Sequence, residues 1–318
     1  MTDFEASSSR INELLVDMES RVGPLTSDRA WEAVREWTSF SARFVLVQAG
    51  SERITLKLGT NWEGDSVAYL ADEIDRVRRV IAKTSSARVA MPRVLGVATN
   101  PPALALEYFE GRPLFEVIPL LGEADRHSVV RACGEAIGAY HRAEEVPDEP
   151  VDRSEAMTEL SAVARRSLVS RATVARIGPG LVRARTYRVS PNDFLLTDQH
   201  TVVLLDPPHI QRYDYVHRDI GSFFMELHRS LVGVRRPVGK DESDMVRSSR
   251  TAFLEGYRET GPVALDRPED IWAIDLFQTG RVMGVARSRV LAGLLGPARV
   301  ALSWALWIRW GLSPPGRG

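Results

Sequence analysis

The sequence is poor in cysteine and has no long apolar run. Its one cysteine, Cys133, excludes a disulfide within the chain, which fits a reducing compartment. No stretch offers the ~18 apolar residues that a membrane-spanning helix needs. Residues 1–16 carry acidic side chains where a secretory signal would be apolar. We therefore expect a cytoplasmic protein.

The chain also lacks an excess of either charge and is almost free of lysine. A formal net charge of −1 excludes the basic excess of a generic nucleic-acid binder, so we expect no nucleic-acid partner. Only Lys57, Lys83 and Lys240 are lysines, and the other 38 of the 41 basic residues are arginine. A lysine in this chain is therefore an exception. Hydrophobic residues at 44% and charged residues at 26% are ordinary for a soluble globular protein.

The hydrophobic periodicity predicts helices and then strands in the first part of the chain. Strands are expected at residues 44–48, 53–58, 94–98 and 103–108, and helices at 11–18, 29–37 and 67–81. The strand at 53–58 alternates apolar and polar residues, and the helix at 67–81 has its apolar residues at helical spacing.

From Gly111 onward the pattern is mostly helical. Helices are expected at residues 114–121, 125–144, 154–169, 216–232, 245–259, 268–295 and 298–310, with a short β segment at 185–206. A small sheet-rich lobe followed by a larger helical lobe is an α+β plan. We predict an N-lobe at residues 1–110 and a C-lobe at residues 111–318.

Two charged residues of the first lobe suggest a phosphate-binding pair. Lys57 lies on the second predicted strand, where a flexible ammonium on a rigid support suits nucleotide phosphates. Glu73 shares a face of the following helix with Leu70 and Val77, so it leans toward the packed side and can pair with Lys57. The alternatives are an exposed strand lysine and an acid on a solvated face.

Two further segments suggest nucleotide and metal contacts. Residues 104–114 form a predicted buried strand that runs into a glycine-broken turn, and its edge at Glu107 and Phe109 can offer groups to a purine. A plain linker between the lobes is the alternative. The apolar strand at 202–205 ends in Asp206, and a carboxylate there is costly unless it is paired or metal-bound. We interpret Asp206 as a metal ligand, with a structural cap as the alternative.

The order of these features resembles the aminoglycoside/choline phosphotransferase family, which has a protein-kinase-like fold. The resemblance covers about residues 35–257 and rests on Lys57, Glu73, the segment 104–114, Ala139-Tyr140-His141, the run from Ser190 to Leu196, Leu205-Asp206, Arg218-Asp219-Ile220 and the run from Phe253 to Tyr257. It implies ATP and Mg²⁺ as cofactors. It also implies that Ser39 and Ser41 lie in the nucleotide loop and that Asp193 and Asp206 hold the metal.

The catalytic loop departs from the family's pattern. The family has His-Gly-Asp and, five residues later, Asn; here Thr186-Tyr187-Arg188 and Asp193 stand at those places. Asp193 keeps an oxygen ligand, whereas the guanidinium of Arg188 stays protonated and cannot act as the base. A one-residue gap would pair Arg188 with the middle residue of the triplet, again without a catalytic carboxylate. Arg188 can instead stabilise the transferring phosphoryl group, so the change implies reduced or rerouted activity.

Two functional hypotheses follow from the resemblance and its departures. The first is an ATP-dependent kinase acting on a hydroxyl of a small molecule, natural product or peptide. The second is a pseudokinase that binds a nucleotide or a protein partner without phosphotransfer, and nucleotidylation is a weaker third.

After Asp275 the chain has no acidic residue, and Trp304, Trp307 and Trp310 recur every three residues. That pattern indicates a basic face for a partner, an anionic substrate or a membrane surface, or else a helix packed in the core.

Overall fold

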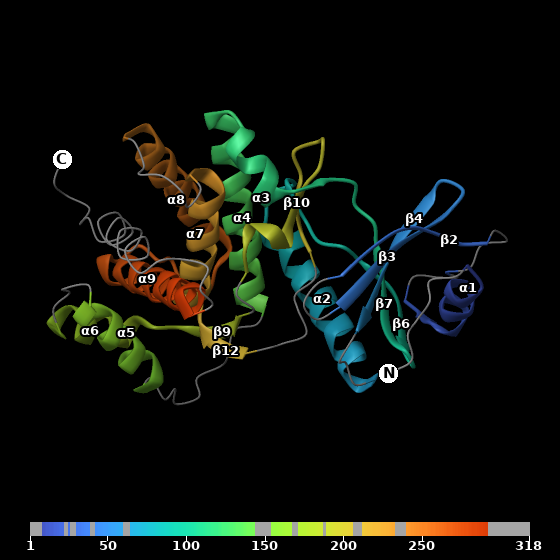
Figure 1. Cartoon of the computed structure of the whole chain (residues 1–318), viewed down its shortest axis with the longest axis horizontal. Coiled ribbons are helices and arrows are strands. Elements are labelled where there is room, and N and C mark those ends of the chain that lie inside the picture. The colour runs from blue at the N-terminus through green and yellow to red at the C-terminus, as the bar shows by residue number, and fades with distance from the viewer. Residues whose placement is uncertain are drawn as a thin grey trace.

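A computed structural model describes residues 8–21, 25, 30–38, 42–59, 64–143, 154–166, 171–186, 189–205, 212–232 and 240–291. Figure 1 shows a sheet-rich part, built from the first hundred residues, beside a larger part made mainly of helices. The predicted α+β plan with two lobes is confirmed. The longest helix of the first part, α2 (Gly64–Thr84), lies between the sheet and the helical part.

A six-stranded antiparallel sheet forms the first lobe, in the order β1-β6-β7-β4-β3-β2. Its strands are β1 (Glu19–Ser20), β2 (Glu32–Thr38), β3 (Ala42–Ala49), β4 (Glu52–Gly59), β6 (Val94–Thr99) and β7 (Pro102–Glu107). The hairpin between β3 and β4 turns at Gly50, whose φ of 63° favours glycine. The four predicted strands are confirmed.

The prediction of a helix over residues 29–37 is wrong. Residues Glu32–Thr38 form strand β2 at the edge of the sheet, and all seven of them are exposed. β2 pairs with β3, and the ring of Trp37 stacks on that of Phe44 with centroids 5.3 Å apart. A segment without a buried face of its own carries no decisive periodicity, so pairing with the neighbouring strand decides its conformation.

The two faces of this sheet are covered by different helices. The apolar side of α2 packs on one face through the residues that the periodicity marks, namely Val67, Leu70, Ile74, Val77 and Ile81. Helix α1 (Ser8–Asp17) packs on the other face, where Ile11, Leu14 and Leu15 contact a second cluster that includes Val45, Val47 and Leu56. Successive strand residues therefore alternate between the α2 side and the α1 side.

The helical lobe contains most of the remaining chain. Its helices are α3 (Leu114–Val117), η1 (Ile118–Leu120), α4 (Glu123–Ala143), α5 (Ser154–Arg166), α6 (Arg171–Ile177), η2 (Gly178–Gly180), η3 (Pro191–Asp193), α7 (Val216–Val232), α8 (Lys240–Thr260) and α9 (Pro268–Leu291). The predicted helices that fall on these segments are confirmed, and the short α6 was not predicted. The helix expected at 298–310, with its three tryptophans, lies outside the described residues.

Two small sheets complete the second lobe. The first has the order β5-β11-β10-β8, with β5 (Val89–Ala90), β8 (Arg112–Pro113), β10 (Phe194–Leu196) and β11 (Val202–Leu204). The second pairs β9 (Arg183–Thr186) with β12 (Arg212–Tyr215). β5 comes from the N-terminal part of the chain yet pairs in parallel with β11. The boundary at residues 110 and 111 therefore stays a prediction.

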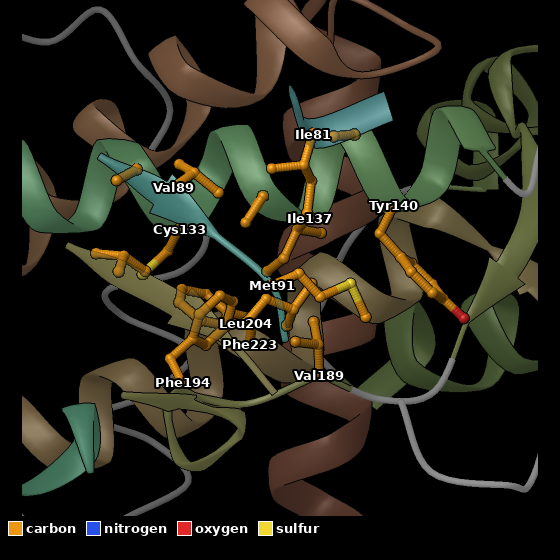
Figure 2. Close-up of a cluster of buried hydrophobic side chains, with 14 of the residues drawn as sticks. Ile81, Val89, Met91, Cys133, Ile137, Tyr140, Val189, Phe194, Leu204 and Phe223 are labelled. Carbon is orange, nitrogen blue, oxygen red and sulfur yellow. The ribbon is translucent and has the colours of Figure 1, made fainter. Parts of the chain in front are cut away.

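One apolar cluster joins the two lobes. Figure 2 shows side chains from α2, the β5 region, α4, β10, β11 and α7 packed together, among them Ile81, Val89, Cys133, Ile137, Phe194, Leu204 and Phe223. Burial raises the pKa of the Cys133 thiol well above its ordinary value, so the thiol stays neutral. Cys133 is therefore a small core residue.

Helices α4 and α8 cross at two glycines. A Cβ on Gly134 would lie 2.0 Å from the carbonyl oxygen of Phe253, and a Cβ on Gly256 would lie 2.0 Å from that of Arg131. Both positions therefore need the absence of a side chain, because the two backbones touch there.

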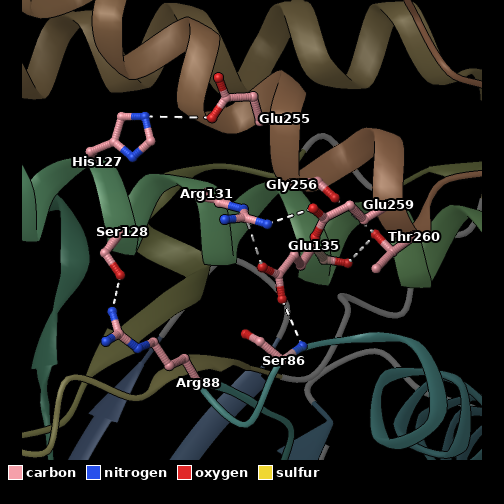
Figure 3. Close-up of polar contacts among 10 residues, drawn as sticks. All are labelled: Ser86, Arg88, His127, Ser128, Arg131, Glu135, Glu255, Gly256, Glu259 and Thr260. Carbon is pink, nitrogen blue, oxygen red and sulfur yellow. Dashed lines mark hydrogen bonds and ion pairs between the residues drawn. The ribbon is translucent and has the colours of Figure 1, made fainter.

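Polar contacts between α4 and α8 also fix this crossing. In Figure 3, Arg131 forms an ion pair with Glu259, and the hydroxyl of Thr260 donates to the carbonyl oxygen of Glu135 at 2.8 Å. The buried carboxylate of Glu135 accepts from the backbone N–H of Ser86 at 2.7 Å. The crossing of α4 and α8 is thereby tied to the turn that follows α2.

No helix in the part of the chain that the structure describes is both long and apolar enough to cross a membrane.

We expect the free energy of unfolding to fall as the pH is lowered from about 6.5 to about 4. His228 on α7 is buried, and burial, with a smaller effect of Arg250, lowers its pKa from 6.5 to about 4. Below pH 6.5 the unfolded chain binds a proton that the folded chain resists, so stability present above pH 6.5 is lost on acidification. The loss from this residue reaches at most about 3 kcal/mol.

The measurement is urea denaturation between pH 7 and pH 4.5, for the wild type and for His228→Gln. The slope of stability against pH should be shallower in the variant. Burial also lowers the pKa of His217 and raises that of Asp275. Both groups are present in both proteins, so their contributions to the pH dependence of stability largely cancel in the comparison. Equal slopes would contradict the expected titration of His228.

Candidate functional site

Lys57 is a buried lysine on β4, with 2% of its surface exposed. Its cross-strand neighbours are Phe44 on β3 and Leu104 on β7, and both pack in the cluster that includes the apolar face of α2. Lys57 therefore lies on the α2 side of the sheet. Its Nζ is 5.8 Å from the centroid of the Phe44 ring, within the range of a cation–π contact. The alternative of an exposed strand lysine is excluded.

Glu73 lies on the buried face of α2 and is fully buried. Its Oε1 accepts a hydrogen bond from the hydroxyl of Tyr140 on α4 at 3.3 Å. The neighbouring acids Asp72 and Asp75 instead reach Arg21, each at 3.0 Å, on the outer side of the helix. The alternative of a solvated Glu73 is therefore also excluded.

Lys57 and Glu73 are thus two buried charges, one on the sheet face that α2 covers and the other on α2 itself. Burying either charge alone is costly unless it is paired or hydrogen-bonded. Their direct ion pair stays a prediction.

The predicted purine-binding segment, residues 104–114, runs from β7 through β8. The carboxylate of Glu107 accepts from the backbone N–H, Nε and Nη2 of Arg93 at 3.2, 3.2 and 3.3 Å, and the N–H of Glu107 donates to the carbonyl of Arg93 at 2.9 Å. Phe109 is partly buried between β7 and β8. A Cβ on Gly111 would lie 2.9 Å from the carbonyl oxygen of Leu196, so the glycine lets this segment pass close to β10. The segment is therefore held in place, and its contact with a purine stays a prediction.

Asp193 is oriented by its own turn. The Oδ2 of Asp193 accepts from the N–H of Ser190 at 2.6 Å and from its hydroxyl at 2.9 Å, while the N–H of Asn192 donates to that hydroxyl at 3.3 Å. These contacts form a capping box around η3. The N–H of Leu205 donates to the carbonyl oxygen of Asp193 at 2.8 Å, which fixes the end of β11 against the turn. In the sequence, the next residue is Asp206.

A buried polar chain supports the start of this loop. Nδ1 of His141 lies 3.0 Å from the Tyr257 hydroxyl, and its Nε2 lies 3.1 Å from Oδ2 of Asp219. The other oxygen of Asp219 accepts from the backbone N–H of Val189 at 2.9 Å. Helices α4, α7 and α8 therefore hold the backbone that leads into Ser190 and Asp193.

Sequence reasoning used His141, Asp219 and Tyr257 only as landmarks, and it gave Tyr140 no role. One signal in the sequence marks His141: it follows a helical run of apolar and small residues, where an unpaired polar group would be costly. Which of them touch one another depends on the packing of three helices.

Several predicted site residues lie outside the described ranges. They are Ser39 and Ser41 of the nucleotide loop, Arg188 of the catalytic loop and the proposed metal ligand Asp206. Among the residues that are placed, no three His, Cys, Asp or Glu side chains gather into a group that could hold a metal ion. The predicted metal site is thus described only on its Asp193 side.

Comparisons with known proteins identify the fold. No family model matches the sequence, and no curated protein matches it. The fold, in contrast, matches many solved structures. A Ralstonia eutropha protein described provisionally as an aminoglycoside phosphotransferase has a TM-score of 0.55 at 12% identity, covering 97% of this chain and 98% of its own.

The amicoumacin kinase hAmiN, in complex with AMP-PNP, Ca²⁺ and Ami, has a TM-score of 0.51 at 14% identity, covering 89% of each chain. The spectinomycin phosphotransferase APH(9)-Ia, in complex with ADP and spectinomycin, has a TM-score of 0.51 at 9% identity, covering 98% of this chain and 99% of its own. The chain therefore has the two-lobed, kinase-like fold of small-molecule phosphotransferases.

Proposed function

We propose that this protein is an ATP-dependent phosphotransferase of the aminoglycoside phosphotransferase type, acting on a hydroxyl of a small molecule or natural product. The observation that carries the proposal is that two charged residues, Lys57 on β4 and Glu73 on α2, are both buried. The neighbours hAmiN and APH(9)-Ia, whose structures contain a nucleotide together with a small molecule, support it.

Lys57 is proposed to hold the phosphates of the nucleotide, and Glu73 to hold Lys57 in place. A buried ammonium suits this task because its charge acts in a medium of low dielectric constant. The hydrogen bond from Tyr140 fixes the carboxylate of Glu73, and through it the position of the ammonium. Because the side chain of Glu107 is engaged by Arg93, contacts to the purine would come from the backbone near Glu107 and Phe109.

Asp193 and Asp206 are proposed to hold Mg²⁺, which prefers carboxylate oxygens. Asp193 fits this role because the capping box orients its carboxylate. In addition, the N–H of Leu205, the residue before Asp206, donates a hydrogen bond to the carbonyl oxygen of Asp193. When bound, ATP with Mg²⁺ would supply the transferable phosphoryl group and the cation that neutralises its charge. The chain from Tyr257 through His141 and Asp219 keeps the loop that carries Asp193 in place.

Arg188 is proposed to stabilise the transferring phosphoryl group and not to act as a base. A positioned base contributes roughly 10²–10⁴-fold to the rate of a catalysed reaction. In phosphoryl transfer, positioning of the reactants and neutralisation of charge account for much of the remaining rate enhancement. The protein should therefore be a slow but competent kinase. We do not favour a pseudokinase, because burying Lys57 and Glu73 lowers stability, and a protein that acts only as a scaffold does not need these two charges. A cytoplasmic setting is part of the proposal and is supported by the single buried cysteine.

The test is a calorimetric titration of ATP with Mg²⁺ and with EDTA. We expect binding that tightens at least about tenfold when Mg²⁺ is present, because a metal held by two carboxylates bridges protein and phosphates. Asp206→Ala should abolish the Mg²⁺ dependence. The control is Asp244→Ala, which removes an exposed carboxylate of α8 and should leave binding unchanged. No binding of millimolar ATP in either condition would exclude the proposed function.

A further inference from the structure

A second polar site lies on the opposite side of α2 from Lys57. A cavity of about 200 Å³ opens where α2, β6 and the end of β1 meet, and its lining consists of Arg21, Asp75, Arg78, Arg79, Arg93 and Val94. Glu73 faces the core from the same helix, so α2 lies between Glu73 and the arginines of this cavity, while Arg93 of the lining reaches the purine segment through its ion pair with Glu107. The proposed function does not use any of the lining residues as ligands.

The lining of this cavity, the arginine cavity, has more positive than negative charge. Arg21 pairs with Asp72 and Asp75 at 3.0 Å each, and Arg93 pairs with Glu107 at 3.2 Å. Two of the four arginines that line the cavity, Arg21 and Arg93, thus already have carboxylate partners. The remaining charges, on Arg78 and Arg79, are therefore the ones that a ligand would meet.

Arg78 and Arg79 form no ion pair with any residue in the described part of the chain. The Nε of Arg78 is also buried there without a hydrogen-bond partner. An unmet buried donor, especially a charged one, is costly, and a native structure usually supplies an acceptor for it. A bound anion would give the outer nitrogens of this guanidinium an acceptor and, after a small rotation, Nε as well.

We propose that the arginine cavity binds a phosphate group, carried by inorganic phosphate or by a small phosphate monoester. Guanidinium groups match phosphate oxygens with paired, charge-assisted hydrogen bonds. The cavity is smaller than the roughly 300 Å³ at which pockets for drug-sized ligands begin, so a small anion fits it better than a nucleotide. The proposal does not depend on the protein being a kinase.

The test titrates inorganic phosphate and glycerol phosphate separately into the full-length protein by calorimetry, at low salt and in a phosphate-free buffer. The test variant is Arg78→Gln with Arg79→Gln. The control variant is Arg247→Gln with Arg258→Gln, which removes the same charge from exposed positions of α8. We expect wild type and control to bind alike and the test variant to bind at least about tenfold more weakly. A preference for one probe distinguishes free phosphate from a monoester.

A second measurement locates the ligand directly. In ¹H–¹⁵N spectra, phosphate should shift the Nε–Hε signal of Arg78, which is assigned by its loss in Arg78→Gln. Two results would overturn the proposal. One is that the double variant binds phosphate as tightly as the wild type. The other is that Lys57→Met loses phosphate binding while phosphate leaves the Arg78 signal of the wild type unchanged, which would place the phosphate in the nucleotide site. Absence of phosphate binding to the folded wild type would overturn it too.

Discussion

Gly256→Ala is expected to lower the free energy of unfolding by about 3 kcal/mol or more, since overpacking against backbone has few ways to relax. The added Cβ would lie 2.0 Å from the carbonyl oxygen of Arg131 and 3.0 Å from the backbone nitrogen of Glu135. Neither atom belongs to a flexible side chain, so α4 and α8 would have to move apart. That movement would also disturb Tyr257, which contacts His141 in the chain that holds the catalytic loop.

The matched control is Gly284→Ala in α9. A Cβ there meets nothing within 4 Å, and the position is exposed within a helix. Alanine should therefore stabilise this helix by up to about 1 kcal/mol. Urea denaturation of both variants checks the opposite signs. If Gly256→Ala is as stable as the wild type, the close approach of α4 and α8 is wrong.

Gly134 adds a test of the same crossing. Its own Cβ would lie 2.0 Å from the carbonyl oxygen of Phe253, one turn before Gly256. If each alanine forces the same separation of the helices, the double variant should cost less than the two single costs together. Residues in contact couple in this way, whereas distant residues do not.

Much of the fold could be predicted because its elements bury regular apolar faces. The helix α2 and the strands β3, β4, β6 and β7 are decided by the periodicity of their own residues. β2 could not be predicted, because its residues are exposed and its conformation depends on pairing with β3. The seven-residue α6 is too short to show a clear helical period.

The candidate site divides in the same way. Lys57 could be found because it is a rare lysine on a predicted strand, and Glu73 because it shares a helix face with Leu70 and Val77. Both residues are buried. The link from His141 through Asp219 to the N–H of Val189 could not be found. Its members lie on different elements, and only the packing of α4 against α7 and α8 brings them together.

Lys57→Met is expected to weaken ATP binding at least about 100-fold. The substitution removes the only cation that the proposed function assigns to the phosphates from the N-lobe, and loss of one buried charged partner costs about 2–5 kcal/mol, or roughly 30-fold to several thousandfold. Methionine keeps most of the side-chain volume, so packing beside Phe44 and Leu104 is preserved. Lys83→Met, at an exposed position in the last turn of α2, is the control and should bind ATP normally.

A double-mutant cycle with Glu73→Gln then tests the pair itself. Glutamine retains an acceptor for the hydroxyl of Tyr140 and removes only the charge, so the helix should stay in place. If Glu73 acts by holding Lys57, Glu73→Gln should weaken ATP binding in the wild type and have little further effect in Lys57→Met. Calorimetry measures the four affinities, and thermal unfolding confirms that each variant is folded. Full additivity would mean that the two buried charges serve separate purposes, and Glu73 would then have to be assigned to the packing of α2 against α4.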